Sequence, residues 1–263
     1  MDKISLTTLA ELKEKGESPE ILFWVGCAGA FDDRYKKVTQ AFVKILHAAG
    51  IKFAVLGNEE SCTGDPARRA GNEFLFQMQA INNIQVMNGY GVKKIVTSCP
   101  HCFNTLKNEY PELGGNYEVI HHSQLLKELL EKGLVKLEAG EKKNFETITF
   151  HDSCYLGRAN GIYEIPREIF QNLQMELKEM KRSREKGLCC GGGGAQMFKE
   201  PEKGNKDINV ERVEEVLKTG AKTLVVACPF CMTMLQDGLK NKEKENEVKV
   251  KDIVELIAEA KGL

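Results

Sequence analysis

The cysteines of this chain repeat along the sequence, and this repeat constrains the fold more than any other feature. Of the nine cysteines among 263 residues, eight form four equivalent pairs. The members of two pairs lie 127 residues apart, and those of the other two lie 129 residues apart. The pairs are Cys27 with Cys154, Cys62 with Cys189, Cys99 with Cys228, and Cys102 with Cys231. The flanking residues match as well, since KKIVTSCPHCFNTLKNEY (93–110) parallels KTLVVACPFCMTMLQDGLK (222–240), so we infer a duplication.

A duplication of this length predicts two homologous domains. The boundary is expected in EKGLVKLEAGEKKNFE (131–146), a charged stretch that separates a helical pattern from an apolar strand. We therefore expect an N-terminal domain over residues 1–140 and a C-terminal domain over residues 141–263. A chain of 263 residues can bury an adequate hydrophobic core whether it forms one large domain or two smaller ones.

Short apolar runs alternate with helical patterns in both halves. Strands are expected at 21–25, 51–56, 92–97, 147–151, 173–178 and 223–227. Helices are expected at 35–49, 73–88, 160–172 and 207–219. In the helix 73–88, Phe74, Gln77, Met78 and Ile81 fall near one face. Continuous apolar strands that alternate with helices predict an α/β fold, in which each domain is a small, mainly parallel, Rossmann-like sheet flanked by helices.

The positions of the cysteines relative to these strands predict a metal site in each domain. Four cysteines each follow a predicted strand: Cys27, Cys99, Cys154 and Cys228. Ligands of parallel α/β sheets bind outside the carboxyl ends of the strands, so these cysteines should converge on one edge of each sheet. Pro100 and Pro229 end their strands and place Cys102 and Cys231 on the first turn of the next helix. The positive end of a helix there favours thiolate over thiol.

The net charge, the apolar stretches and the number of cysteines exclude several classes of function. The net charge of −1 offers no electrostatic footprint for nucleic acid. The N-terminus has no signal-peptide pattern, and the most apolar stretch, Thr223–Leu235, is too short to span a bilayer. We therefore expect a cytoplasmic protein with no direct membrane span, whose contact with a membrane would be made through partner subunits. Because reducing compartments keep thiols reduced, nine cysteines indicate metal or redox chemistry rather than disulfides.

The second half carries the fuller cysteine pattern. Its five cysteines are Cys154, Cys189, Cys190, Cys228 and Cys231. A tetrahedral zinc site uses four ligands, so zinc would leave a spare thiol, whereas a cluster of several irons can use five. The glycines at 191–194 allow backbone N–H groups to approach cluster sulfur closely. These glycines do not satisfy the G-x-G-x-x-G pattern of dinucleotide sites.

The spacing C-x34-CCG-x37-C-P-x-C resembles the cysteine-rich CCG domain, which occurs in the catalytic subunit of heterodisulfide reductase and in related iron–sulfur oxidoreductase subunits. The resemblance covers nearly the whole chain, since that catalytic subunit has two such domains in tandem. It implies a non-cubane [4Fe-4S] cluster on Cys154, Cys189, Cys190, Cys228 and Cys231. In heterodisulfide reductases such clusters bind and cleave a disulfide.

The first half departs from this pattern at one position. Cys62 aligns with Cys189, but Thr63 stands where Cys190 would be. Four cysteines remain as metal ligands: Cys27, Cys62, Cys99 and Cys102. This set fits a four-ligand [4Fe-4S] cluster, a modified cluster with Asp65 or water on one iron, or zinc.

The preferred hypothesis is an iron–sulfur subunit of a multi-subunit oxidoreductase, which transfers electrons and reduces a disulfide or thiol substrate. The chain has no ferredoxin run and no flavin or nicotinamide fingerprint. Its electrons would therefore come from a partner, a ferredoxin-like subunit with two clusters, together with a flavoprotein or a membrane quinone-reducing subunit. One alternative is an electron-relay subunit of a lactate-, glycolate- or glycerol-3-phosphate-type quinone-linked dehydrogenase. Alternatives of other classes are a zinc-stabilised interaction module and a dithiol enzyme that uses the C-P-x-C pairs directly.

Several polar residues near these motifs have both a structural and a functional interpretation. Asp65-Pro66 resembles an N-cap followed by the first helical residue, and the arginines at 68 and 69 could instead bind an anion. His121-His122 are expected at the surface or a domain interface, before a helix 124–130 capped by Ser123, and a metal or proton-relay role is their functional alternative. His151-Asp152 lie at a strand end, where either could hydrogen-bond near the cluster.

Overall fold

A computed structural model describes residues 6–135, 147–200 and 203–263. The chain divides into two compact units, Met1–Val135 and Lys136–Gly262, and each has its own sheet. Residues 136–146 of the predicted boundary stretch lie outside the described residues.

The first unit is built on a parallel sheet with the strand order β2-β1-β3-β4. The strands are β1 (Ile21–Trp24), β2 (Phe53–Ala54), β3 (Lys94–Thr97) and β4 (Glu118–His121). In the central strand β1, Leu22 is paired with Ala54 on one side and Ile95 on the other. All four residues of β1 are buried, because helices cover both faces of a parallel sheet.

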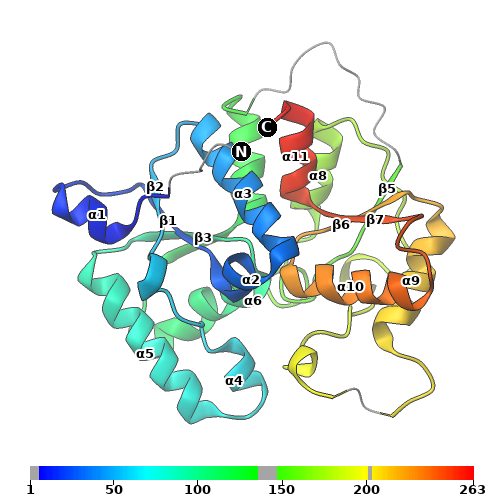
Figure 1. Ribbon diagram of the computed structural model, residues 1–263, viewed down its shortest axis with the longest axis horizontal. Coiled ribbons are helices and arrows are strands. Elements are labelled where there is room, and N and C mark those ends of the chain that lie inside the picture. Colours follow the sequence, from blue (N-terminus) through cyan, green and yellow to red (C-terminus); the bar gives the residue numbers. More distant parts are fainter. Residues whose placement is uncertain (1–5, 136–146, 201–202) are drawn as a thin grey trace. The chain divides into compact units, whose positions relative to one another are not determined.

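Helices α3 and α7 cover one face of this sheet, and α5 lies on the other (Figure 1). Phe42 of α3 and His122 of α7 meet with ring centroids 5.9 Å apart. The helices are α1 (Leu9–Glu14), α2 (Gly26–Phe31), α3 (Asp33–Ala48), α4 (Asp65–Arg69), α5 (Glu73–Gly89), α6 (Pro100–Asn104) and α7 (His122–Glu131). A π-helical turn (Thr105–Glu109) and 3-10 turns (Gly57–Glu59, Tyr110–Leu113) complete the unit.

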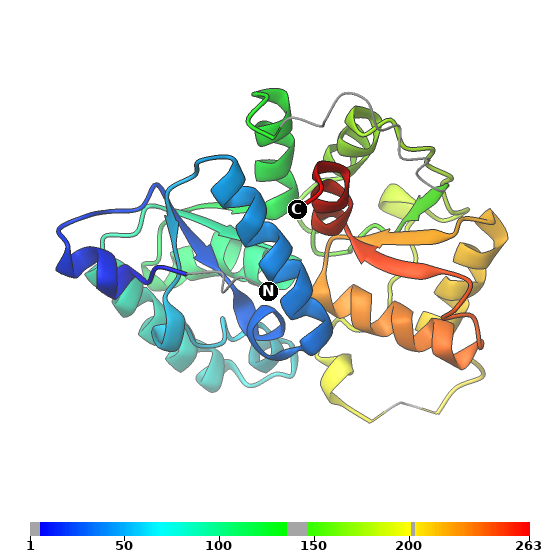
Figure 2. The same ribbon diagram turned by 45° about the horizontal axis from the view of Figure 1, so that its top comes forward.

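The second unit repeats this plan on a parallel sheet with the strand order β5-β6-β7. Its elements are β5 (Ile148–Phe150), α8 (Glu164–Asn172), α9 (Ile208–Thr219), β6 (Thr223–Val226), α10 (Pro229–Asn241), β7 (Lys249–Asp252) and α11 (Ile253–Lys261). Two 3-10 turns are also present, Arg184–Lys186 and Gln196–Phe198. Figure 2 shows α10 and α11 on opposite faces of the sheet. These parallel sheets, flanked by helices, confirm the predicted α/β fold.

One predicted strand is wrong. Residues 173–178 form only a single parallel bridge, between Leu177 and Ile148. Gln174 has a φ of 54°, and this turn lets the chain reach β5 only for the last few residues. The bridge nevertheless occupies the same place beside β5 that β2 occupies beside β1, so both units share one topology.

Two predicted helix starts are displaced. Asp65 is not an N-cap, because Gly64 precedes it with a φ of 88° and α4 begins at Asp65 itself. Ser123 is not the cap of the next helix, because α7 begins at His122 and the imidazole of His121 accepts the Ser123 N–H at 3.4 Å. Of the two positions expected for these histidines, the surface is wrong, since both are fully buried.

Helix α5 is apolar on two sides. Its inner side buries five residues against the rest of the unit: Phe76, Ala80, Asn83, Ile84 and Met87. The predicted face with Phe74, Met78 and Ile81 is instead exposed, with Phe74 76% accessible.

Among the helices of residues 6–135, 147–200 and 203–263, none combines the length and apolarity that a bilayer crossing requires.

The close packing of α9 on α10 depends on Gly238. A Cβ at this position would lie 2.9 Å from the Asn209 carbonyl oxygen and 2.9 Å from Val213 Cγ2. We expect Gly238→Ala to lower the free energy of unfolding by about 1–3 kcal/mol, because overpacking outweighs the gain in helix propensity. Gly204→Ala, where a Cβ meets nothing within 4 Å, is the matched control and should change stability by less than about 0.5 kcal/mol. Urea unfolding of both variants measures this, and equal stabilities would contradict the prediction.

Candidate functional site

The five cysteines of the second unit come from three separate segments. Cys154 follows β5, and Cys189 and Cys190 lie in the loop that leads to α9. Cys228 caps α10, and Cys231 lies in the first turn of that helix, as the C-P-x-C spacing predicts. All nine cysteines of the chain lie within the described residues, and none of them forms a disulfide.

These five thiols contact one another in one continuous series. Cys189 is hydrogen-bonded to Cys154 on one side and to Cys190 on the other. Cys190 in turn contacts Cys231, which contacts Cys228. The structure therefore brings together every cysteine that the sequence assigned to this centre.

The electrostatics of the series favour a bound cation. Hydrogen bonds from Cys154 and Cys190 lower the pKa of Cys189. The same bond to Cys189 raises the pKa of Cys154, and that of Cys190 is also raised. Without a metal, one thiolate thus suppresses the ionisation of its neighbours. A positively charged metal centre would remove this suppression of ionisation, because it stabilises several thiolates at once.

Backbone N–H groups point at two of these sulfurs. The Gly191 N–H donates to Cys189 Sγ at 3.3 Å, and the Cys231 N–H donates to Cys228 Sγ at 3.5 Å. Gly191 has a φ of 91°, a conformation that other residues rarely adopt. At Gly192 a Cβ would lie 3.7 Å from Cys190 Sγ and 3.0 Å from Met234 Cγ. The glycines after Cys190 therefore let the backbone lie against the thiols.

Asp152, two residues before Cys154, is held by a buried ion pair. Arg167 of α8 donates to both of its carboxylate oxygens, at 2.8 and 2.9 Å. The Arg184 N–H adds a third bond, at 2.7 Å, and Glu179 accepts from Arg167 Nε at 2.6 Å. Asp152 therefore anchors the segment that carries Cys154. The hydrogen bonds that the structure gives its carboxylate go to arginines, not to a thiol.

His151 lies deeper, against the buried side of the centre. Its Nδ1 accepts a hydrogen bond from Arg212 Nε at 3.0 Å. One of its ring nitrogens lies within 4.8 Å of the sulfurs of Cys190 and Cys231. Burial, together with the charge of Arg212, lowers the pKa of His151 to about 3, so the imidazole is neutral.

The first unit brings its four cysteines together in the same way. Cys27 lies on α2 and Cys62 precedes α4, while Cys99 caps α6 and Cys102 lies on its first turn. A hydrogen bond with Cys99 and burial hold the pKa of Cys102 well above its usual value. Burial, together with Cys102 and Cys62, raises the pKa of Cys27 to about 12. The four thiols thus interact electrostatically as one cluster.

Thr63 occupies the place where the second unit has a fifth thiol. It is 2% exposed, and its hydroxyl lies 3.8 Å from Cys102 Sγ. Cys190 has the same relation to Cys231 in the second unit. A hydroxyl thus takes the position of a thiol, and the two cysteine clusters differ in their side chains.

Both carboxylate oxygens of Asp65 interact with other side chains. One carboxylate oxygen accepts from Arg69 Nε at 3.0 Å, and the other lies 2.9 Å from His101 Nδ1. Burial acts to raise the pKa of Asp65, but the bonds with His101 and Arg69 lower it overall. Arg68 and Arg69 both pair with Glu109. These pairs favour the structural role of the arginines over anion binding.

Sequence reasoning missed Glu60, which closes the turn before Cys27. Its carboxylate accepts the N–H groups of Val25 at 3.0 Å and Gly26 at 2.6 Å. Burial raises the pKa of Glu60 to about 7 despite these bonds. Nothing local to Glu60 in the sequence indicates this role, because its partners lie 34 and 35 residues away.

Arg167 and Arg212 were also missed, although the sequence carries a signal for each. Arg212 is three residues after Asn209 and four before Val216, so it lies on the buried side of α9. Arg167 is three residues before Phe170, on the buried side of α8. A charged residue at an apolar position of a helix indicates a buried partner.

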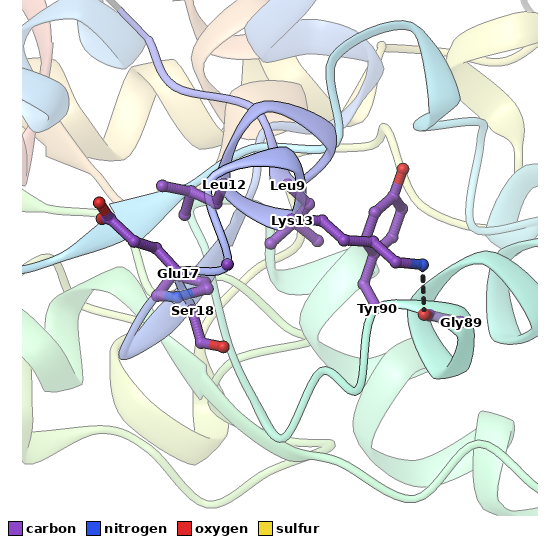
Figure 3. A pocket seen from close by; sticks show the side chains of 9 residues that line it. Leu9, Leu12, Lys13, Glu17, Ser18, Gly89 and Tyr90 are labelled. Carbon is purple, nitrogen blue, oxygen red and sulfur yellow. Dashed lines mark hydrogen bonds between the residues drawn. The ribbon is translucent and has the colours of Figure 1, made fainter.

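The structure also has a small pocket of about 260 Å³ in the first unit (Figure 3). It lies between α1 and the end of α5, where Lys13 Nζ donates to the Gly89 carbonyl at 3.3 Å and lies over the Tyr90 ring. None of the cysteines lines it, so it contributes nothing to either centre.

Known proteins resemble this chain along nearly all of its length. It is 48% identical to the probable iron-sulfur-binding oxidoreductase FadF of Bacillus subtilis over 97% of this chain and 36% of that protein. It is 44% identical to an EtfAB:quinone oxidoreductase of Syntrophomonas wolfei over 95% of this chain and 35% of that protein. One subunit of the dihydromethanophenazine:CoB–CoM heterodisulfide reductase from Methanosarcina barkeri is 35% identical, over 94% of this chain and 60% of that protein. The chain thus spans about a third of the first two relatives.

A family model matches the chain twice. The cysteine-rich CCG domain is found at residues 21–107 and again at 148–236. The two matches contain all nine cysteines and the strands and helix starts that carry them. They cover more than half of the chain, which therefore belongs to the CCG cysteine-rich domain family, with two copies of the domain in tandem.

Proposed function

We propose that this chain is the iron–sulfur part of a multi-subunit oxidoreductase and that it transfers electrons. The observation that carries the proposal is the series of five contacting thiols at the carboxyl end of the second sheet. Five thiols exceed what a zinc ion uses, and their mutual suppression of ionisation calls for a cationic centre. The names of the relatives, an iron-sulfur-binding oxidoreductase and a heterodisulfide reductase, support this proposal.

In the second unit, Cys154, Cys189, Cys190, Cys228 and Cys231 would hold a non-cubane [4Fe-4S] cluster. Such a cluster supplies one-electron redox chemistry and an iron that can take a substrate sulfur. The N–H groups of Gly191 and Cys231 orient and stabilise the thiolates that they contact. Because Cys154 and Cys189 are partly exposed while the other three are buried, a partner or substrate would approach from the side of these two.

In the first unit, Cys27, Cys62, Cys99 and Cys102 would hold the second metal centre. Four thiols fit either a [4Fe-4S] cluster or a zinc ion. Thr63 supplies no thiolate, so the fifth ligand of the other unit has no counterpart here. We propose a [4Fe-4S] cluster, because this unit is a second copy of the same cysteine-rich domain.

Two classes of reaction fit such a chain, disulfide reduction and electron relay. As a heterodisulfide reductase-like subunit, the chain would reduce a disulfide with two electrons and two protons, giving two thiols. As a relay, it would pass electrons singly between a flavoprotein and a quinone-reducing subunit in the membrane. The identity of 44% to an EtfAB:quinone oxidoreductase, against 35% to the heterodisulfide reductase, favours the relay. In either case a ferredoxin-like partner with two clusters would serve as the electron donor or acceptor.

Metal analysis of the anaerobically reconstituted chain tests the cluster assignment. We expect roughly eight irons and a matching amount of sulfide per chain, because each of two [4Fe-4S] clusters holds four irons. Roughly four irons with roughly one zinc would instead assign zinc to the first unit. Less than one iron per chain after reconstitution would overturn the proposed function.

The fifth thiol should determine the electronic structure of the second centre. We expect Cys190→Ser to retain most of the iron but to change the EPR and Mössbauer spectra, because four thiolates remain and the cluster loses its fifth. Thr63→Ser keeps the hydroxyl beside Cys102 and is the matched control, whose spectra should equal those of the wild type. Identical spectra for Cys190→Ser and the wild type would remove Cys190 from the ligand set.

A further inference from the structure

His151 is a buried polar residue that neither the cysteine ligands nor the ion pairs around Asp152 account for. It follows β5 directly, and its backbone N–H extends the sheet by bonding to the Val225 carbonyl at 2.9 Å. The side chain is 1% exposed. Because the ring has almost no contact with water, each of its two nitrogens either forms a hydrogen bond within the unit or has no partner.

Arg212 decides which ring nitrogen carries the proton. Its Nε donates to His151 Nδ1 at 3.0 Å, and a guanidinium has no acceptor site. Nδ1 must therefore offer its lone pair, and the proton of the neutral ring lies on Nε2.

Arg212 is itself held in place. It is fully buried, and its Nη1 donates to Glu215 and to the Arg182 carbonyl, each at 2.7 Å. Arg182 in turn pairs with Glu215 at 2.6 Å. This network leaves the arginine little freedom to turn away from His151, so the tautomer of the ring is built into the fold.

The Nε2–H of His151 has no hydrogen-bond partner in the part of the chain that the structure describes. The sulfurs of Cys190 and Cys231 lie within 4.8 Å of a ring nitrogen. Because Arg212 occupies Nδ1, the nitrogen available to a sulfur is Nε2. A buried donor without a partner, beside a set of proposed cluster ligands, indicates that its acceptor arrives with the cluster.

The first unit has a comparable donor at the equivalent position. Trp24 stands three residues before Cys27, as His151 stands three residues before Cys154. Its indole Nε1–H is likewise buried without a hydrogen-bond partner among the described residues. The two units thus differ in sequence at this position but both keep a buried ring N–H at the end of the first strand.

We infer that His151 donates its Nε2–H to a sulfur of the centre held by the five cysteines and acts as a positioning residue that tunes the reduction potential. It is not a metal ligand, because the nitrogen free of Arg212 carries the proton. The inference rests on the proposed function. An N–H···S bond is stronger when the sulfur carries more charge, so it stabilises the reduced state and raises the potential.

Two isosteric substitutions separate the roles of the ring nitrogens. In His151→Asn the amide reaches only as far as Nδ1, so it can still accept from Arg212 but places no donor toward the sulfurs. In His151→Gln the amide nitrogen reaches the position of Nε2 and keeps that donor, while Arg212 loses its acceptor. Redox titration of the reconstituted protein gives the potential, and circular dichroism during thermal unfolding reports whether each variant is folded.

We expect His151→Asn to shift the potential downward, so that at fixed potential the ratio of reduced to oxidised centre falls about tenfold, or about 59 mV for one electron. His151→Gln should stay close to the wild-type potential even though it disturbs the contact with Arg212. A shift in His151→Gln equal to that in His151→Asn, or no shift in either, would overturn the inference.

The tautomer provides a test that does not need the cluster. Long-range ¹H–¹⁵N spectra of the folded apoprotein should place the His151 proton on Nε2, and a proton on Nδ1 would overturn the inference. If no cluster assembles in the wild type, the proposed function fails, but this measurement still shows which ring nitrogen of His151 carries the proton.

Discussion

The crowding of thiols at the carboxyl ends of parallel strands is the constraint on which each unit depends. In the second unit, hydrogen bonds from Cys154 and Cys190, together with the Gly191 N–H, lower the pKa of Cys189, while the pKa values of Cys154 and Cys190 are raised. The strands place these sulfurs, the first turn of α10 adds one more, and the glycines after Cys190 admit backbone N–H groups. A cationic centre would stabilise several of these thiolates at once and so couple metal binding to the fold of the unit.

Buried charges hold the strand ends that carry the thiols. Asp152 and Arg167 are both buried. Besides their mutual bonds, Arg167 donates to Glu179, and Asp152 accepts the Arg184 N–H. Such a pair contributes little to stability by itself, but the loss of one partner would leave an unpaired charge in the core. The pair therefore fixes the position of the residues just before Cys154 rather than adding greatly to stability.

The two units hold their cysteines on one plan but differ in the side chains around them. Thr63 replaces a thiol with a hydroxyl beside Cys102, and Trp24 replaces the imidazole of His151 with an indole. Both changes keep a polar atom at the same place in the topology. The second unit keeps the fifth thiol and an imidazole with a fixed tautomer, which fits a centre that exchanges electrons with a substrate or partner. The first unit keeps four thiols, which fits a simpler centre.

The sequence predicted the α/β class and most helices because these depend on local periodicity. It failed where a distant contact decided the outcome. Residues 173–178 have the composition of a strand, yet only Leu177 reaches a partner, because the turn at Gln174 separates the rest from β5. The polar pair His121-His122 suggested a surface or a domain interface, but both are fully buried; His121 caps α7 and His122 contacts the Phe42 ring. Helix α5 has apolar residues on both sides, so its pattern alone could not say that Phe74 faces solvent.

The spacing of the cysteines was sufficient to determine the duplication, the placement of sulfur after strands and at helix starts, and the inequivalence of the two sets. These properties follow from the order of residues along the chain. The tertiary structure alone decided which other side chains meet the sulfurs. Glu60 reaches the turn before Cys27 from 34 residues away, and Arg212 reaches His151 from 61 residues away. Long polar side chains take their partners from whichever element packs beside them, and that packing is a property of the folded unit and not of any local sequence pattern.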